Sequence, residues 1–135
     1  MVQNDVNTIA ITPLIVTEAR TQLVDMAQYF RVGNGFLVKS TYGGTINNLN
    51  DLCGKKVATL AGSTTAGDLQ AQKALCPSSS PLTIVPVPTR TELPNSVLNG
   101  QADVAVTSQL YLLTFARDSN NQLKVVGMPY NVRPY

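Results

Sequence analysis

The stretch Val57-Ala-Thr-Leu-Ala-Gly-Ser-Thr-Thr-Ala-Gly-Asp-Leu69 decides the fold. Its apolar start predicts a short buried strand, and Gly62 predicts the tight turn that follows it. Ser63, Thr64 or Thr65 is then suited to cap the start of a helix. Backbone N–H groups at such a strand-to-helix junction favour an anion. The alternative is an ordinary connection with a good cap and no ligand.

A second stretch, residues 9–20, predicts a buried strand over 8–12, a proline-containing link and a helix that starts at Thr17. Arg20 falls in the first turn of this helix, where a cation opposes the helix dipole. A carboxylate ligand held in bidentate fashion would compensate. The alternatives are a solvated side chain or a structural ion pair with Glu18 or Asp25.

Length and composition narrow the function classes. The chain has 135 residues, which predicts one domain. Net charge is +2 and only 13% of residues are charged, which argues against the basic stripe of a nucleic-acid-binding module. Residues 1–5 lack the basic and apolar regions of a signal peptide, so any leader is expected outside this chain. Histidine is absent, and we expect neither a metal nor another cofactor.

Two cysteines, Cys53 and Cys76, flank the predicted strand–turn–helix unit. A helix that lies back along its strand would bring the two together. A disulfide there would stabilise the fold by about 3 kcal/mol and would fit an oxidising compartment. The alternative is a pair of buried free thiols.

Strands and helices alternate along the rest of the chain. This alternation predicts an α/β fold, with a mainly parallel sheet flanked by helices. Ligands of open α/β sheets bind beyond the carboxyl ends of the strands, where residues 62–65, Ser108 and Pro13 are expected to converge. Further strands are predicted at 29–39, 82–86, 103–107 and 123–126, and helices at 17–26, 49–52, 65–75, 91–100 and 108–116.

Six segments carry a more specific pattern. They are residues 9–20 (IAITPLIVTEAR), 21–30 (TQLVDMAQYF), 49–57 (LNDLCGKKV), 61–65 (AGSTT), 99–106 (NGQADVAV) and 123–127 (LKVVG). Each is degenerate alone, but in this order they resemble the type 2 periplasmic solute-binding proteins, in particular the polar-amino-acid group.

The resemblance implies an architecture and a role. Such proteins have two lobes, joined by two hinge strands, that close on a small solute for uptake through an ABC-type membrane permease. Residues 1–135 resemble the second lobe alone, with hinge-derived segments near 29–39 and 123–135. The first lobe would then be missing, and the parent protein would be periplasmic or extracellular.

The resemblance also implies ligand-binding residues. Arg20 aligns with the arginine that clamps the ligand carboxylate. Thr64, with Ser63 beside it, aligns with the loop residue that binds that carboxylate or a side chain. Pro13 aligns with a position that offers its backbone carbonyl to the ligand amine.

Two positions depart from the family pattern. Ile15 stands where threonine or serine is usual, and Ser108 stands where aspartate or glutamate usually meets the ligand ammonium. A neutral hydroxyl does not replace a charge-assisted bond worth about 1.5–3 kcal/mol. We therefore expect a carboxylate or neutral solute rather than a conventional α-amino acid, or loss of binding.

Two other functions compete with solute binding. A lobe without a ligand could be a structural module that self-associates into a homo-oligomer through an exposed, apolar hinge face. A dehydratase-like enzyme of this fold would need a general acid, and Ser108 and the absence of histidine argue against one. The aromatic residues at periodic positions indicate core rather than site: Tyr29, Phe30, Phe36, Tyr111 and Phe115.

Overall fold

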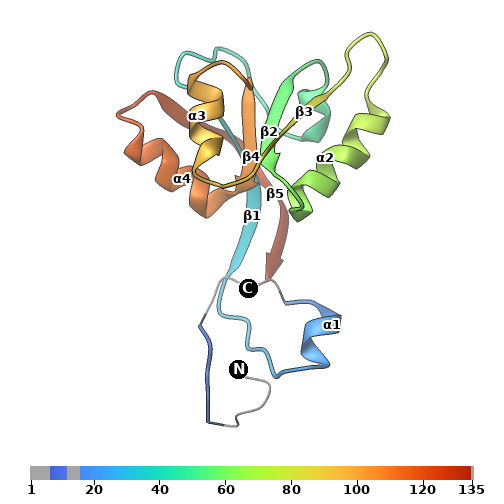
Figure 1. The fold of residues 1–135 in the computed structure, drawn as a ribbon, viewed down its shortest axis with the longest axis vertical. Helices are drawn as coiled ribbons and strands as arrows, with labels where there is room; N and C mark the ends of the chain where they lie inside the picture. The colour runs from blue at the N-terminus through green and yellow to red at the C-terminus, as the bar shows by residue number, and fades with distance from the viewer. Residues whose placement is uncertain (1–6, 12–15, 135) are drawn as a thin grey trace.

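The computed structural model describes residues 7–11 and 16–134, which contain a five-stranded sheet in the order β3-β2-β4-β1-β5 (Figure 1). β2 pairs in parallel with β3 and β4, whereas β1 pairs antiparallel with β4 and β5. Four strands therefore share one direction, and the predicted mainly parallel sheet is confirmed. The strands are β1 (Arg31–Lys39), β2 (Lys56–Leu60), β3 (Thr83–Val87), β4 (Val104–Ser108) and β5 (Leu123–Pro134).

Helices cover both faces of the sheet, and two separate clusters of side chains fill the spaces between. Leu69 of α2 packs with Phe36 on one face, whereas Leu93 of α3 and Leu112 of α4 pack with Leu37 on the other. Phe36 and Leu37 are neighbours that point to opposite faces, as the pleat of a strand requires. The helices are α1 (Glu18–Thr21), the 3-10 helix η2 (Leu49–Leu52), α2 (Thr64–Leu75), α3 (Glu92–Leu98) and α4 (Gln109–Asp118).

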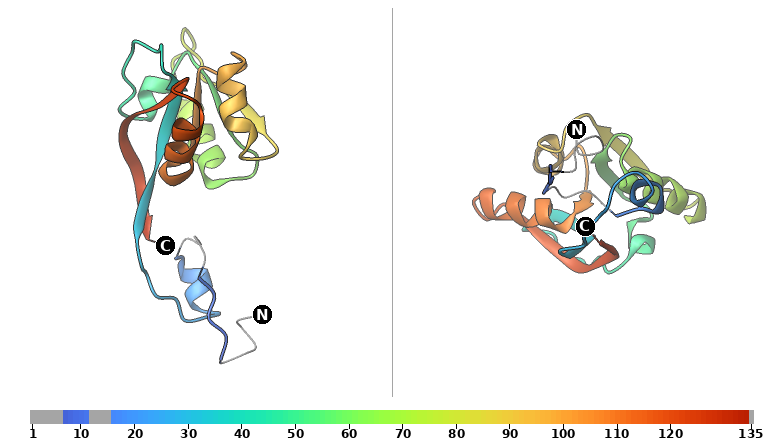
Figure 2. Two further views of the ribbon diagram at one scale, coloured as in Figure 1. Left: turned by 90° about the vertical axis from the view of Figure 1, so that its left-hand side faces the viewer. Right: turned by 90° about the horizontal axis from the view of Figure 1, so that it is seen from below.

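The two strands β1 and β5 extend out of the lobe together (Figures 1 and 2). Their pairing shifts register on either side of Asn34, where the two neighbouring residues are Gly33 and Gly35. β5 continues to Pro134, well past the predicted end at 126, because β1 supplies it with a partner as far as Arg31. We call β1 and β5 the hinge strands after the role that the resemblance implies, and this role stays a prediction.

The N-terminal segment differs from its prediction. Residues 8–11 form no strand, and position 12 lies outside the described residues. The predicted ten-residue helix shortens to the four residues of α1, none of them buried. Leu23, an apolar residue of the predicted helix, is 62% exposed. No sheet or helix packs against this segment closely enough to bury it, and a short helix without such packing gains little stability.

The predicted disulfide between Cys53 and Cys76 is confirmed, with a Cα–Cα distance of 5.5 Å. It joins the residue after η2 to the residue after α2 and so encloses the whole β2–α2 unit. The buried side-chain amide of Gln72 lies beside it and donates a hydrogen bond to Oδ1 of Asn50 at 3.0 Å. A disulfide fits an oxidising compartment. Among the described helices, none has the length and apolar character needed to span a membrane.

Candidate functional site

The candidate site lies at the edge of the sheet where β2, β3 and β4 end and α2, α3 and α4 begin. We call this the carboxyl edge. In Figure 1 it faces the protruding hinge strands and α1. Because β2 and β4 are adjacent and parallel, residues 62–65 and Ser108 leave the sheet at the same edge. The predicted convergence therefore holds for these two segments, whereas Pro13 lies outside the described residues.

The turn after β2 sets up the start of α2. Gly62 has φ +70°, a left-handed conformation that costs other residues energy. The N–H of Ala61 donates to the carbonyl of Val87 at 2.9 Å, which ties this turn to the end of β3. Of the three candidate caps, Ser63 is the one used: its hydroxyl accepts from the N–H of Ala66 at 3.2 Å.

The first amides of α2 remain available. The backbone N–H groups of Thr64 and Thr65 have no acceptor within the described residues. The Thr65 side chain is buried and bonded to the hydroxyls of Thr59 and Ser63, at 2.8 and 2.7 Å, so it fixes the turn. The Thr64 side chain is exposed. These two N–H groups lie at the positive end of the helix dipole and are therefore suited to donate hydrogen bonds to an anion.

Ser108 ends β4 and occupies the N-cap position of α4, but its side chain makes no capping hydrogen bond. It is half-buried and lies opposite Asn34 of β1 in the sheet register. Ser108 therefore lies at the carboxyl edge, and its hydroxyl has no hydrogen-bond partner among the described residues, so it could bind a polar atom of a ligand.

A cation at this edge was missed by the sequence interpretation. Arg90, in the connection between β3 and α3, places its guanidinium carbon 4.6 Å from the ring centroid of Tyr111 in the first turn of α4. Tyr111 was interpreted as core, yet it is only half-buried. The sequence did hold a signal for this site, because Arg90 stands four residues after the predicted strand 82–86, at a carboxyl end. Its aromatic partner, however, is distant in sequence.

The hinge side of the edge also carries polar groups. Asn131 of β5, at φ +48°, donates its side-chain amide to the carboxylate of Asp68 in α2 at 2.9 Å. Tyr130 stacks on Phe36, with ring centroids 5.4 Å apart. Burial, aided by the negative charge of Asp68, raises the pKa of the Tyr130 phenol. This phenol therefore stays neutral at physiological pH.

The structure does not bring all six predicted ligand residues together. Thr64, Ser63 and Ser108 lie at the carboxyl edge. Arg20 lies in α1, which stands apart from the sheet beyond the hinge strands (Figure 2). Pro13 and Ile15 lie outside the described residues. A joint clamp of Arg20 and Thr64 on one carboxylate stays a prediction.

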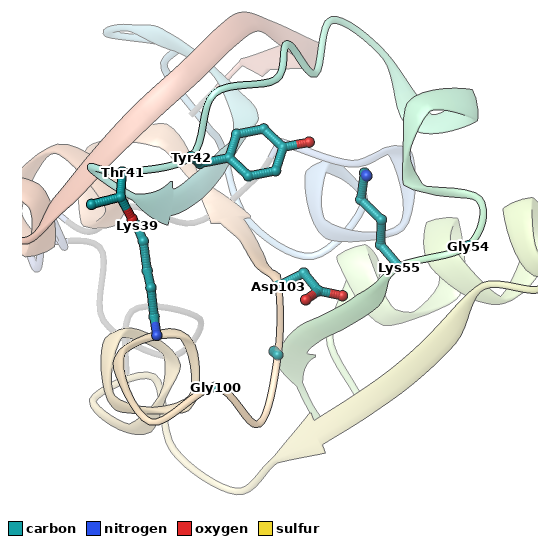
Figure 3. Close-up of a pocket in the computed structure, with 8 residues that line it drawn as sticks. Lys39, Thr41, Tyr42, Gly54, Lys55, Gly100 and Asp103 are labelled. Atoms are coloured by element: carbon teal, nitrogen blue, oxygen red, sulfur yellow. The ribbon is translucent and has the colours of Figure 1, made fainter.

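A depression of about 360 Å³ occupies the opposite, amino edge of the sheet (Figure 3). Two of its three charged side chains have protein partners: the Lys55 ammonium lies 5.7 Å from the ring centroid of Tyr42, and the Asp103 carboxylate accepts a hydrogen bond from the backbone N–H of Lys56 at 2.8 Å. Over the ranges 7–11 and 16–134, no three metal-ligating side chains gather into a group that could hold a metal ion.

No protein-family model matches this sequence, and no curated protein sequence matches it either. Several solved structures, however, are similar to it. An ancestral arginine-binding protein bound to glutamine is 26% identical, with a TM-score of 0.69 over 90% of this chain and 54% of that one. The GluR0 ligand-binding core from Nostoc punctiforme in complex with L-glutamate is 28% identical, with a TM-score of 0.72 over 93% and 55%.

Holo ArgBP from T. maritima is 20% identical, with a TM-score of 0.74 over 90% of this chain and 51% of that one, and it supports the fold alone. The chain spans about half the length of these proteins. It has the fold of one lobe of a type 2 periplasmic binding protein, as the sequence motifs indicated. The similar proteins are solute-binding proteins rather than enzymes, in agreement with the expected absence of enzymatic function.

Proposed function

We propose that this chain is the second lobe of a solute-binding protein and captures a small, polar, carboxylate-bearing solute for ABC-type uptake. One observation carries the proposal: the amides of Thr64 and Thr65 point out of the start of α2 without an acceptor among the described residues. A rigid turn, fixed by the buried Thr65 hydroxyl and the Ser63 cap, holds these donors in place. Preorganised donors of this kind bind an anion at little entropic cost.

The remainder of the site would come from across the hinge. β1 and β5 lead from the lobe to the segment that carries Arg20, Pro13 and Ile15. In a complete protein, closure about these strands would bring Arg20 over a carboxylate already held at Thr64. The solute would then be released to a membrane permease. The disulfide supports a periplasmic or extracellular location for the parent protein.

An isolated lobe supplies only part of the contacts, so we expect dissociation constants of about 1 mM or weaker. Titration of the isotope-labelled chain with butyrate, followed by amide NMR, tests the proposal. The resonances of Thr64 and Thr65 should shift first and saturate. Butyramide, the neutral amide of the same size, serves as the control and should cause no saturable shift. Equal responses to both compounds would contradict anion capture at this helix.

A second function, self-association, is favoured by a different observation. Met128 and Val132 of β5 are 76% and 45% exposed on the hinge strand. Apolar side chains on an edge strand are suited to pair with a second copy. Sedimentation at high concentration tests this function, and replacing Met128 with lysine should abolish any dimer. A monomer at all concentrations would exclude pairing through β5.

A further inference from the structure

Arg90 is an exposed arginine whose guanidinium stacks on an aromatic ring and has no hydrogen-bond acceptor within the described residues. The guanidinium lies over the Tyr111 ring, 4.6 Å from the centroid to its central carbon. Within the described residues it makes no ion pair, and the nearby carboxylate of Glu92 accepts instead from the hydroxyl of Thr89 at 2.8 Å. A stacked guanidinium with free donors is the arrangement by which arginine recognises carboxylates.

The strand order places this guanidinium beside the candidate site. β2 lies between β3 and β4. Arg90 follows β3 and Tyr111 follows β4, so their contact bridges the end of β2, where the turn to Thr64 leaves the sheet. The helices α3 and α4 pack on one face of the sheet and α2 on the other. The Arg90 guanidinium and the amides of α2 therefore flank the end of β2 from opposite sides.

The charges at this edge are unfavourable for a ligand cation. Ser108, at the end of β4, is neutral. Two acidic side chains of the flanking helices accept hydrogen bonds within the lobe: Glu92 from the hydroxyl of Thr89, and Asp68 from the side-chain amide of Asn131. The helices α2 and α4 also direct the positive ends of their dipoles to this edge. An ammonium group of a ligand would therefore be repelled by the guanidinium of Arg90. A second carboxylate of a ligand would instead be attracted to the same guanidinium.

We propose that the solute is a dianion without a cationic group, such as a short dicarboxylate. One carboxylate would bind the amides of Thr64 and Thr65, and the other would bind the guanidinium of Arg90 on its Tyr111 support. This inference rests on the proposed function and names the solute class for the same site. Arg90 is then the residue that selects a second negative charge.

The test compares glutarate, the monocarboxylate butyrate and zwitterionic L-glutamine by amide and arginine side-chain NMR. Glutarate should bind at least tenfold more tightly than butyrate and should shift the Arg90 Nε–H resonance as well as the amides of Thr64 and Thr65. This ratio is the smaller end of the effect expected for one added charge-assisted contact. L-glutamine should bind no better than butyrate. Tighter binding of L-glutamine than of glutarate would overturn the inference.

Variants localise the effect. Arg90→Gln should weaken glutarate about tenfold and change butyrate less than twofold. Arg117→Gln is the matched control, because it removes the same charge from the outer part of α4, where Arg117 pairs with Asp118 at 2.8 Å. It should leave both ligands unchanged. Tyr111→Leu should weaken glutarate severalfold and Tyr111→Phe should not, since only the former removes the aromatic support.

The outcomes separate the two proposals. Unchanged glutarate affinity in Arg90→Gln, with butyrate still bound at Thr64, would overturn the dianion inference and leave anion capture intact. An equal loss in Arg117→Gln would assign the effect to net charge and would also overturn it. No saturable shift at Thr64 and Thr65 with either carboxylate would overturn both.

Discussion

The lobe that begins at Arg31 and the segment that precedes it are built from similarly apolar sequence but differ in burial. In the lobe, Phe36 and its neighbours are completely buried between the sheet and its helices. In the described parts of the segment, 7–11 and 16–30, no residue is buried, and Ile9, Ile11 and Leu23 are exposed. Local pattern alone therefore does not hold a strand or a long helix in place.

This difference in burial indicates that the lobe contributes most of the stability of the chain. A four-residue helix has few internal hydrogen bonds and cannot offset the entropy of ordering its residues. The N-terminal segment reaches the hinge through the hydrogen bond from Val16 N–H to the carbonyl of Pro134, at 3.1 Å.

Removing one aromatic side chain from each region should give the largest difference in the free energy of unfolding. Phe36→Ala empties a fully buried position and should lower the free energy of unfolding by about 3–5 kcal/mol. Tyr29→Ala removes an exposed ring and should change it by about 1 kcal/mol or less. Urea unfolding measures both. Equal losses would mean that the N-terminal segment is packed in solution.

Opening the disulfide should come next. The bond between Cys53 and Cys76 closes a loop with a sequence separation of 23 residues, which corresponds to about 3 kcal/mol of stabilisation in the chain-entropy account. Thermal unfolding with and without reductant gives the difference. A Cys53→Ala, Cys76→Ala double variant should unfold at the same temperature in both conditions. A reductant effect in that variant would point to some other target.

Loss of the α2 cap should have a smaller effect. Ser63→Ala removes the hydroxyl that accepts from Ala66 N–H and should cost about 1 kcal/mol. Thr64→Ala is the control, since that side chain is exposed, and should stay within about 0.5 kcal/mol of the original chain. Chemical denaturation resolves the two. The opposite ranking would mean that Thr64 rather than Ser63 caps the helix.

Removal of residues 1–24 should have the smallest effect on the lobe. None of its described residues is buried, and the hydrogen bond from Val16 N–H to Pro134 of β5 is a small contribution, so the free energy of unfolding should fall by about 1 kcal/mol or less. Hydrogen exchange of the full-length chain gives an independent measurement. In that chain the backbone amides of residues 18–24 should exchange quickly, whereas those of β2 should be protected. A loss as large as that of Phe36→Ala would contradict the division between the two regions.

Prediction from sequence was correct where a local sequence pattern is compatible with a single local structure. Gly62 followed by Ser63 predicted the turn and the start of α2, and the structure agrees. Cys53 and Cys76 were paired correctly because their unit folds back on itself. It failed at Leu23 and at residues 8–11. Their apolar pattern predicted burial, but no surface within the described residues covers them.

The amino-acid sequence by itself determined the α/β class, the order of most elements and the position of the turn and helix start after β2. These follow from hydrophobic period, glycine conformation and capping, which act over a few residues. Only the tertiary structure decided the length of β5, the position of α1 apart from the sheet and the contact between Arg90 and Tyr111. These depend on which strands are neighbours, and strand order arises from long-range packing that no local pattern encodes.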